Sequence, residues 1–168
     1  MLTISGVDIQ SNEDVAIKLV FNKYFEMARW EWDTHVKLSS GVGIPRARWI
    51  GSEEDYQTLV FDLLGPTLED LLNYCGRRFT LKTLLLLADQ AISRIQYIHS
   101  KRFIYCDIKP ENFMMGIGRR GNVLHVTDFG ITRMACDPSR DTPYRTRCFV
   151  GSHRYASINA HNFIGTFQ

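Results

Sequence analysis

A Gly65-Pro66 dipeptide separates two parts of the chain whose apolar patterns differ, and this change constrains the fold more than any other feature. Before it, β-type runs occupy 15–20, 47–50 and 58–63, and an aromatic, charged helix is predicted over about 23–38. After it, the pattern is mostly helical. The sequence therefore predicts an α+β fold whose boundary lies near Leu64, with parts 1–64 and 65–168.

The second part contains two helix signals and one short strand. Thr67 can cap a helix that carries a carboxylate, Asp70, three residues later. Thr80 can cap a longer helix over 81–99, whose apolar positions recur with a 3.6-residue period. A β-type run at 122–127 then ends directly before Asp128, which it would present at its end.

Charge is balanced overall but uneven along the chain. The net charge of +2 is too small to indicate a nucleic-acid ligand, and none is predicted. Between residues 129 and 155, however, five arginines stand against two aspartates. Such a segment favours acidic or phosphorylated protein partners, and the alternative is a solvated loop.

Nothing in the sequence indicates export or membrane insertion. The first residues lack a basic stretch followed by an apolar run, and the leucine run at 84–87 is too short to span a bilayer. The four cysteines have no paired spacing, which favours reduced thiols over disulfides or zinc. An intracellular protein, in the cytoplasm, the nucleus or both, is therefore expected.

The run Asp-Ile-Lys-Pro-Glu-Asn at 107–112 carries groups suited to phosphate and Mg²⁺ chemistry. Asp107 can orient a hydroxyl group, and Lys109 can neutralise a migrating phosphoryl group. Asn112 and Asp128, which begins an Asp-Phe-Gly triplet, offer oxygen ligands for Mg²⁺. Each motif alone is weak, but the two at this spacing, with a β-type run between them, are specific.

Lys18 ends an apolar run and would need a partner if it were buried. Glu31, inside the predicted helix, is the preferred partner, and Glu26 is the alternative. Either carboxylate could instead belong to a solvated face. Beside a nucleotide, Lys18 would contact phosphate oxygens.

Several further segments make the chain resemble the casein kinase I family of serine/threonine protein kinases over about 5–165. These are GVGIP at 41–45, LLGPTLEDL at 63–71, LLLADQ at 85–90, YIHSK at 97–101, NFMMG at 112–116 and RYASIN at 154–159. The resemblance implies a two-lobed kinase fold, incomplete at both ends, and transfer of the ATP γ-phosphate to Ser or Thr with Mg²⁺ as cofactor. A monomer is expected.

The resemblance also assigns roles to residues. Asp107 and Lys109 would serve the transfer, while Lys18 and Glu31 would order the nucleotide. The adenine would lie against the connector at 62–64, including Leu64, with Phe61 behind it as gatekeeper. Arg154, with Arg145, would bind the acidic or phosphorylated part of a substrate.

The chain also departs from the family pattern. Two parts of the family pattern are not present, the glycine-rich phosphate loop and the later large-lobe helices. Because those helices would cover the predicted helix over 81–99, part of its apolar stripe is expected to be exposed. Tyr105-Cys106 replaces the usual His-Arg pair and is expected to loosen Asp107. Two spans, from Lys18 to Glu31 and 144–151, are one residue short, which could displace the ion pair or the anion pocket. A catalytically inactive binding module, or a fragment of a longer product, is therefore the alternative to an active kinase.

Overall fold

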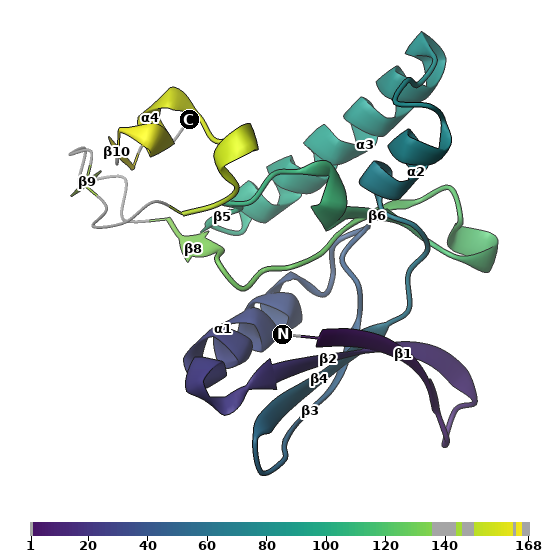
Figure 1. Ribbon diagram of the computed structural model, residues 1–168, viewed down its shortest axis with the longest axis vertical. Coiled ribbons are helices and arrows are strands. Elements are labelled where there is room, and N and C mark those ends of the chain that lie inside the picture. Colours follow the sequence, from purple (N-terminus) through teal and green to yellow (C-terminus); the bar gives the residue numbers. More distant parts are fainter. Residues whose placement is uncertain (1, 136–143, 146–149, 163, 166–168) are drawn as a thin grey trace.

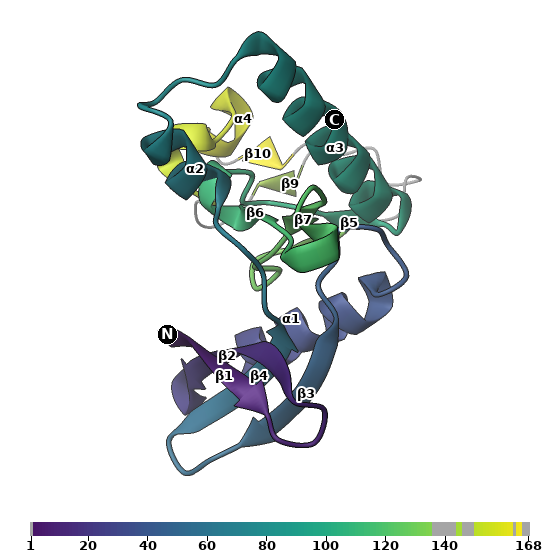
Figure 2. The ribbon, with the colours of Figure 1, turned by 90° about the vertical axis from the view of Figure 1, so that its right-hand side faces the viewer.

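The computed structural model describes residues 2–135, 144–145, 150–162 and 164–165. Two parts are visible, joined by the connection that contains Gly65 and Pro66 (Figure 1). One part holds a four-stranded sheet and helix α1. The other holds helices α2 and α3 with several short strands, and the turned view in Figure 2 shows the same separation.

The sheet is antiparallel throughout, with the order β1-β2-β4-β3. Its strands are β1 (Leu2–Asp8), β2 (Glu13–Phe21), β3 (Ala47–Ser52) and β4 (Tyr56–Asp62). The three runs predicted before Gly65 correspond to β2, β3 and β4. Strand β1 is not predicted by the sequence. Lys18 lies opposite Thr3 of β1 and Leu59 of β4, so it occupies an inner strand of the sheet.

Helix α1 (Phe25–Leu38) follows a short 3₁₀ turn, Asn22–Tyr24, and covers one face of the sheet. Val20, Ala28, Leu59 and Phe61 form the apolar contact between helix and sheet. The buried face of α1 also carries three polar residues, which are Glu31, Thr34 and His35. This inward polar face places charged and titratable groups beside the sheet.

The second part begins with α2 (Leu68–Tyr74) and α3 (Leu81–Ser100). Thr67 and Asp70 form the predicted capping box of α2, and Thr80 accepts a hydrogen bond from the backbone N–H of Thr83 at the start of α3. The remaining elements are β5 (Phe103–Ile104), η2 (Pro110–Asn112), β6 (Phe113–Met115), η3 (Gly118–Arg120), β7 (Leu124–Val126), β8 (Arg133–Met134), β9 (Tyr144–Arg145), η4 (His153–Tyr155), α4 (Ile158–His161) and β10 (Ile164–Gly165).

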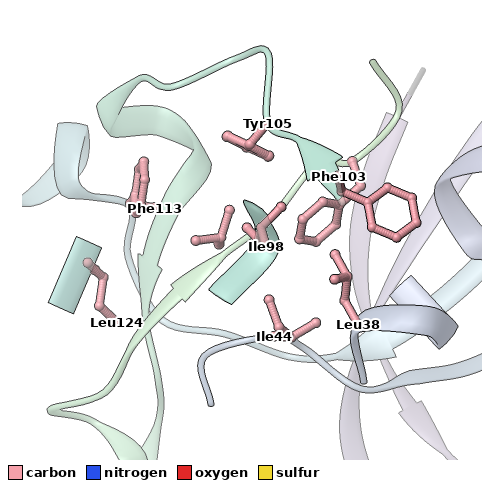
Figure 3. Close-up of a cluster of buried hydrophobic side chains, with 9 residues drawn as sticks. Leu38, Ile44, Ile98, Phe103, Tyr105, Phe113 and Leu124 are labelled. Carbon is pink, nitrogen blue, oxygen red and sulfur yellow. The ribbon is translucent and has the colours of Figure 1, made fainter. Parts of the chain in front are cut away.

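A second apolar core joins the two parts of the chain. Leu38 and Ile44, from α1 and the loop after it, lie beside Ile98 of α3 and Phe103 of β5 (Figure 3). Tyr105, Phe113, Leu124, Val126 and Phe129 complete this cluster. Residues from before and after Gly65 therefore share one core, which fixes the sheet against the loops that follow α3.

One face of α3 is exposed, as the sequence predicts. Five of its apolar side chains are more than half exposed, namely Leu81, Leu84, Leu85, Leu86 and Ile92. A stripe of this size is unusual for a helix in contact with water alone. None of the helices in the described part of the chain has the length and apolar character needed to cross a membrane.

Candidate active site

Lys18 and Glu31 form a buried ion pair between the sheet and α1, and the half-buried Asp128 lies beside it. Lys18 Nζ donates to both carboxylate oxygens of Glu31, at 2.6 and 2.7 Å, and to Asp128 Oδ1 at 3.3 Å. Burial alone would lower the pKa of Lys18, but attraction to the two carboxylates outweighs it and raises the pKa. The ammonium group is therefore charged at neutral pH.

The structure selects Glu31 over Glu26 as the partner of Lys18. Glu31 lies on the buried face of α1, whereas Glu26 is exposed. The short spacing between Lys18 and Glu31, which could have displaced the pair, does not do so, because the helix brings the carboxylate to within 2.6 Å of the ammonium group. The expectation that the short span would displace the ion pair is therefore wrong.

Asp107 lies in a second cluster, in which hydrogen bonds reach both of its carboxylate oxygens. Oδ2 is 2.6 Å from Lys109 Nζ and accepts from Asn112 Nδ2 at 3.0 Å, while Oδ1 accepts from Ser152 Oγ at 2.7 Å. Burial alone would raise the pKa of Asp107, but the bonds from Lys109, Ser152 and Asn112 outweigh it and lower the pKa. Asp107 is therefore an ionised hydrogen-bond acceptor at neutral pH.

Ser152 was not singled out from the sequence. Its hydroxyl group contacts Asp107 and also accepts from Lys109 Nζ at 3.2 Å, so it holds the acid and the cation together. It lies 45 residues beyond Asp107. Its position inside the basic segment at 129–155 is the one signal that could have drawn attention to it, because no local pattern marks a contact between residues so far apart in the sequence.

Asn112 and Asp128 provide the oxygen atoms that suit Mg²⁺. The side-chain nitrogen of Asn112 donates to the carboxylate and the backbone carbonyl of Asp107, both at 3.0 Å, so its side-chain oxygen is the atom that would bind a metal ion. Asp128 has a left-handed backbone conformation, with φ of 59°. An amide oxygen and a carboxylate fit Mg²⁺, which binds oxygen and retains several water molecules.

A cavity of about 350 Å³ connects these groups to the connector between the two parts. Lys18, Asn112 and Asp128 line its polar end. The predicted Phe61 and Leu64 line it as well, together with three apolar residues that the sequence did not reveal, which are Ile4, Ala16 and Met114. A cavity with an apolar wall and a charged end matches a flat base that carries phosphate groups.

A column of aromatic rings lies behind the cavity. Phe61 of β4 contacts His35 of α1 with ring centroids 4.5 Å apart, and His35 meets Phe129 edge-on at 4.6 Å. Tyr105 also meets Phe129 edge-on, with ring centroids 5.6 Å apart. Complete burial, with the positive charge of Lys18 nearby, lowers the pKa of His35 to about 3, so its ring is neutral. The column connects the sheet to the Asp107 loop.

The replacement of the usual His-Arg pair does not loosen the Asp107 loop. Tyr105 is buried, and its hydroxyl group donates to the backbone carbonyl of Thr127 at 2.5 Å. Cys106 is half-buried, and its Sγ lies 3.5 Å from the carbonyl oxygen of Ile104. The phenol therefore ties the Asp107 loop to the Asp128 loop, contrary to the expectation from the sequence.

The predicted anion pocket is described only in part. Arg154 is exposed, and its guanidinium group lies over the ring of Tyr155, 5.8 Å from the ring centroid. The side chain of Arg145 and the whole of Arg140 and Arg147 lie outside the described residues. The substrate role of Arg154 and Arg145 therefore stays a prediction.

Comparison with known families agrees with this geometry. A family model described as "Protein kinase domain" matches residues 3–159, which is nearly the whole chain. The match includes the sheet, α1, the cavity, the Asp107 loop and Asp128. It confirms the predicted two-lobed α+β kinase fold. The chain belongs to the protein kinase family.

Proposed function

We propose that this chain is a serine/threonine protein kinase of casein kinase I type. It would transfer the γ-phosphoryl group of ATP to Ser or Thr hydroxyls in acidic or phosphorylated protein segments. In this proposal, residues 1–64 form the part of the domain that holds the nucleotide. Residues 65–168 carry the transfer and metal-binding groups.

The observation that carries this proposal is that Asn112 belongs both to the cavity and to the hydrogen-bonded cluster around Asp107. Its side chain lines the nucleotide-sized cavity and also donates to Asp107. Asp107 in turn is bonded to Lys109 and Ser152. The hydroxyl-orienting acid, the predicted phosphoryl-neutralising Lys109 and the predicted metal ligand Asn112 therefore belong to one hydrogen-bonded set. Phosphoryl transfer depends on such positioning.

Each residue has a role that its environment supports. Lys18, held by Glu31, would bind phosphate oxygens, and Phe61 and Leu64 would bound the base. Asp107 would accept a hydrogen bond from the attacking hydroxyl group and take its proton late in the transfer. Lys109 would offset charge on the transferring phosphoryl group. Mg²⁺ bound by Asn112 and Asp128 would neutralise phosphate charge.

The finer assignments have separate support. The casein kinase I type has its support in the motifs of the sequence, of which RYASIN at 154–159 is the most specific. The preference for acidic or phosphorylated substrates has its support in the five arginines between residues 129 and 155.

The test is a phosphotransfer assay with Mg-ATP and two peptides that differ only in acidic flanking residues, each offered with Ser, Thr or Tyr as acceptor. The Asp128→Ala and Asp107→Asn variants are expected to lose about 100-fold or more in rate. Asp33→Ala, which removes an exposed carboxylate from α1, is the matched control and should retain the rate. Equal background rates for the wild type and Asp128→Ala would refute the proposal.

A further inference from the structure

A second cavity, of about 670 Å³, lies next to the end of β4 and contains none of the groups assigned to transfer or metal binding. Its wall comes from the loop after α1, the starts of β2 and β3, the end of β4, and the segment from η3 to β7. We call it the arginine cavity. Its charged and polar side chains are Arg46, Arg48, Arg120, Glu13, Asp62, His125, Ser39 and Ser40.

Both carboxylates of the arginine cavity are held by one arginine, and the other two arginines are unpaired. Arg48 Nε lies 2.6 Å from Asp62 Oδ1, and its Nη1 lies 2.8 Å from Glu13 Oε2. Arg46 and Arg120 are exposed and form no ion pair within the part of the chain that the structure describes. Two guanidinium groups are therefore available to an anion. Their planar arrays of N–H donors match the oxygen atoms of a phosphoryl group.

The turn after α1 adds backbone donors to the same wall. The N–H of Ile44 donates to the carbonyl oxygen of Gly41 at 3.2 Å, and Gly43 has a φ of 77°, as the third position of a type II turn requires. The N–H groups of Val42 and Gly43 form no hydrogen bond with any residue that the structure describes. Backbone N–H groups that line a concave wall are ligands in many phosphate sites.

The surroundings of His125 indicate that the local charge is positive. Its Nδ1 lies 3.0 Å from the carbonyl oxygen of Val123, so this nitrogen carries the ring proton. Burial lowers the pKa of His125, and the hydrogen bond to Val123 acts in the opposite direction. The positive charges of Arg120 and Arg94 lower the pKa further. At this ring each of the two arginines has a larger effect than the carboxylate of Asp62, which raises the pKa.

We propose that the arginine cavity binds a phosphoryl group, held by Arg46, Arg120 and the backbone of the turn at 41–44. It is a second anion site beside the nucleotide-sized cavity, and Asp62 lies in the wall of both. Its volume is larger than a phosphate ion needs and falls in the range of pockets that hold organic molecules, which favours a phosphorylated protein segment over the free ion. The alternative is that the two arginines are only solvated.

The experiment follows the backbone amide signals of Val42 and Gly43 by NMR in the full chain. The probes are inorganic phosphate, a phosphoserine peptide whose other residues are uncharged, and the same peptide with unmodified serine. Arg46→Gln and Arg120→Gln each remove one charge and keep most of the side chain. Arg119→Gln is the matched control, because Arg119 is an exposed arginine next to Arg120 that does not line the cavity.

Phosphate and the phosphopeptide are expected to shift both amide signals. Arg46→Gln and Arg120→Gln should each weaken binding by about fivefold, the effect of one charge pair at an exposed site, and Arg119→Gln should not. Tighter binding of the phosphopeptide than of phosphate identifies a protein segment as the source, and equal binding identifies the free ion.

Three outcomes would overturn the inference. These are unshifted amide signals with both phosphate probes, equal shifts by the unmodified peptide, and an equal loss of affinity in Arg119→Gln. The amide signals report binding without turnover. A chain that binds the phosphate probes but transfers no phosphate would therefore refute the proposed kinase function alone.

Discussion

Breaking the buried pair of Lys18 and Glu31 is expected to destabilise the protein much more than breaking a surface pair. At 2.6 Å, and with an effective dielectric constant near 20, the attraction is about 6 kcal/mol before desolvation is subtracted. Removing one partner leaves a buried charge alone. Lys18→Met or Glu31→Met should therefore lower the free energy of unfolding by about 3–5 kcal/mol.

The two single variants are expected to differ in their response to pH. Without Glu31, Lys18 still has Asp128 at 3.3 Å. Without Lys18, Glu31 is a buried carboxylate beside a second carboxylate, and burial already raises its pKa above the ordinary 4.5. It can then take up a proton on folding, so lowering the pH from 8 to about 5 should restore part of the stability of Lys18→Met relative to the wild type.

The measurement is a double-mutant cycle in urea, followed by the fluorescence of Trp30 and Trp32 on α1. The double variant Lys18→Met/Glu31→Met removes both charges, so the coupling free energy should be about 3 kcal/mol. Arg29 and Asp33 form the control pair on the same helix, where side chains 56% and 43% exposed should couple by about 0.5 kcal/mol or less. A coupling below about 1 kcal/mol for Lys18 and Glu31 would refute the reasoning.

Three further predictions follow from burial and capping. The folded-state pKa of His35, about 3, lies below the ordinary 6.5. As the pH falls, the unfolded chain therefore protonates His35 before the folded chain does. Stability should then fall by about 2 kcal/mol from pH 7 to 5 in urea titrations, and His35→Phe should lack that component. Leu85→Lys with Ile92→Lys should reduce aggregation in sedimentation velocity and change stability by less than about 1 kcal/mol. A loss of more than about 2 kcal/mol in the free energy of unfolding would show that these apolar side chains of α3 are packed against other residues. Thr67→Ala should cost about 1 kcal/mol in thermal unfolding, and no loss would contradict the capping role.

Features encoded by neighbouring residues could be predicted from the sequence. The caps at Thr67 and Thr80 depend on residues three positions apart, and α3 follows the 3.6-residue period. The spacing of Asp107, Asn112 and Asp128 predicts the metal and transfer groups because these residues lie on two short loops around one hairpin. Each of these signals is local, so no tertiary information was needed.

The partner of Lys18 was harder to predict from the pattern alone. The buried face of α1 carries Glu31, Thr34 and His35, so the helix has no strong apolar stripe to show which side faces the sheet. The resemblance to a family favoured Glu31, and the contact with Lys18 explains why a carboxylate is tolerated there. When the buried face of a helix is polar, hydrophobic periodicity does not show which side of the helix faces the core.

Contacts between distant segments could not be predicted. Ser152 contacts Asp107 across 45 residues, and Met114 reaches the cavity wall from a strand whose pattern is too short to show a face. The contact made by Tyr105 differs from the expectation for another reason. Replacement of the usual histidine does not remove its contact, because a phenol can donate to a backbone carbonyl as an imidazole can.

The position of Asp128 therefore depends on two independent sets of contacts. One set is ionic, through Lys18 at 3.3 Å. The other is made by its neighbours, since Phe129 is fully buried between His35 and Tyr105 while Thr127 is bonded to Tyr105 and Asn112. Only the second set joins Asp128 to the Asp107 loop. Loss of Lys18 should thus weaken binding of phosphate groups without displacing Asp128, whereas loss of the Tyr105 hydroxyl should loosen Asp128 and leave Lys18 paired with Glu31.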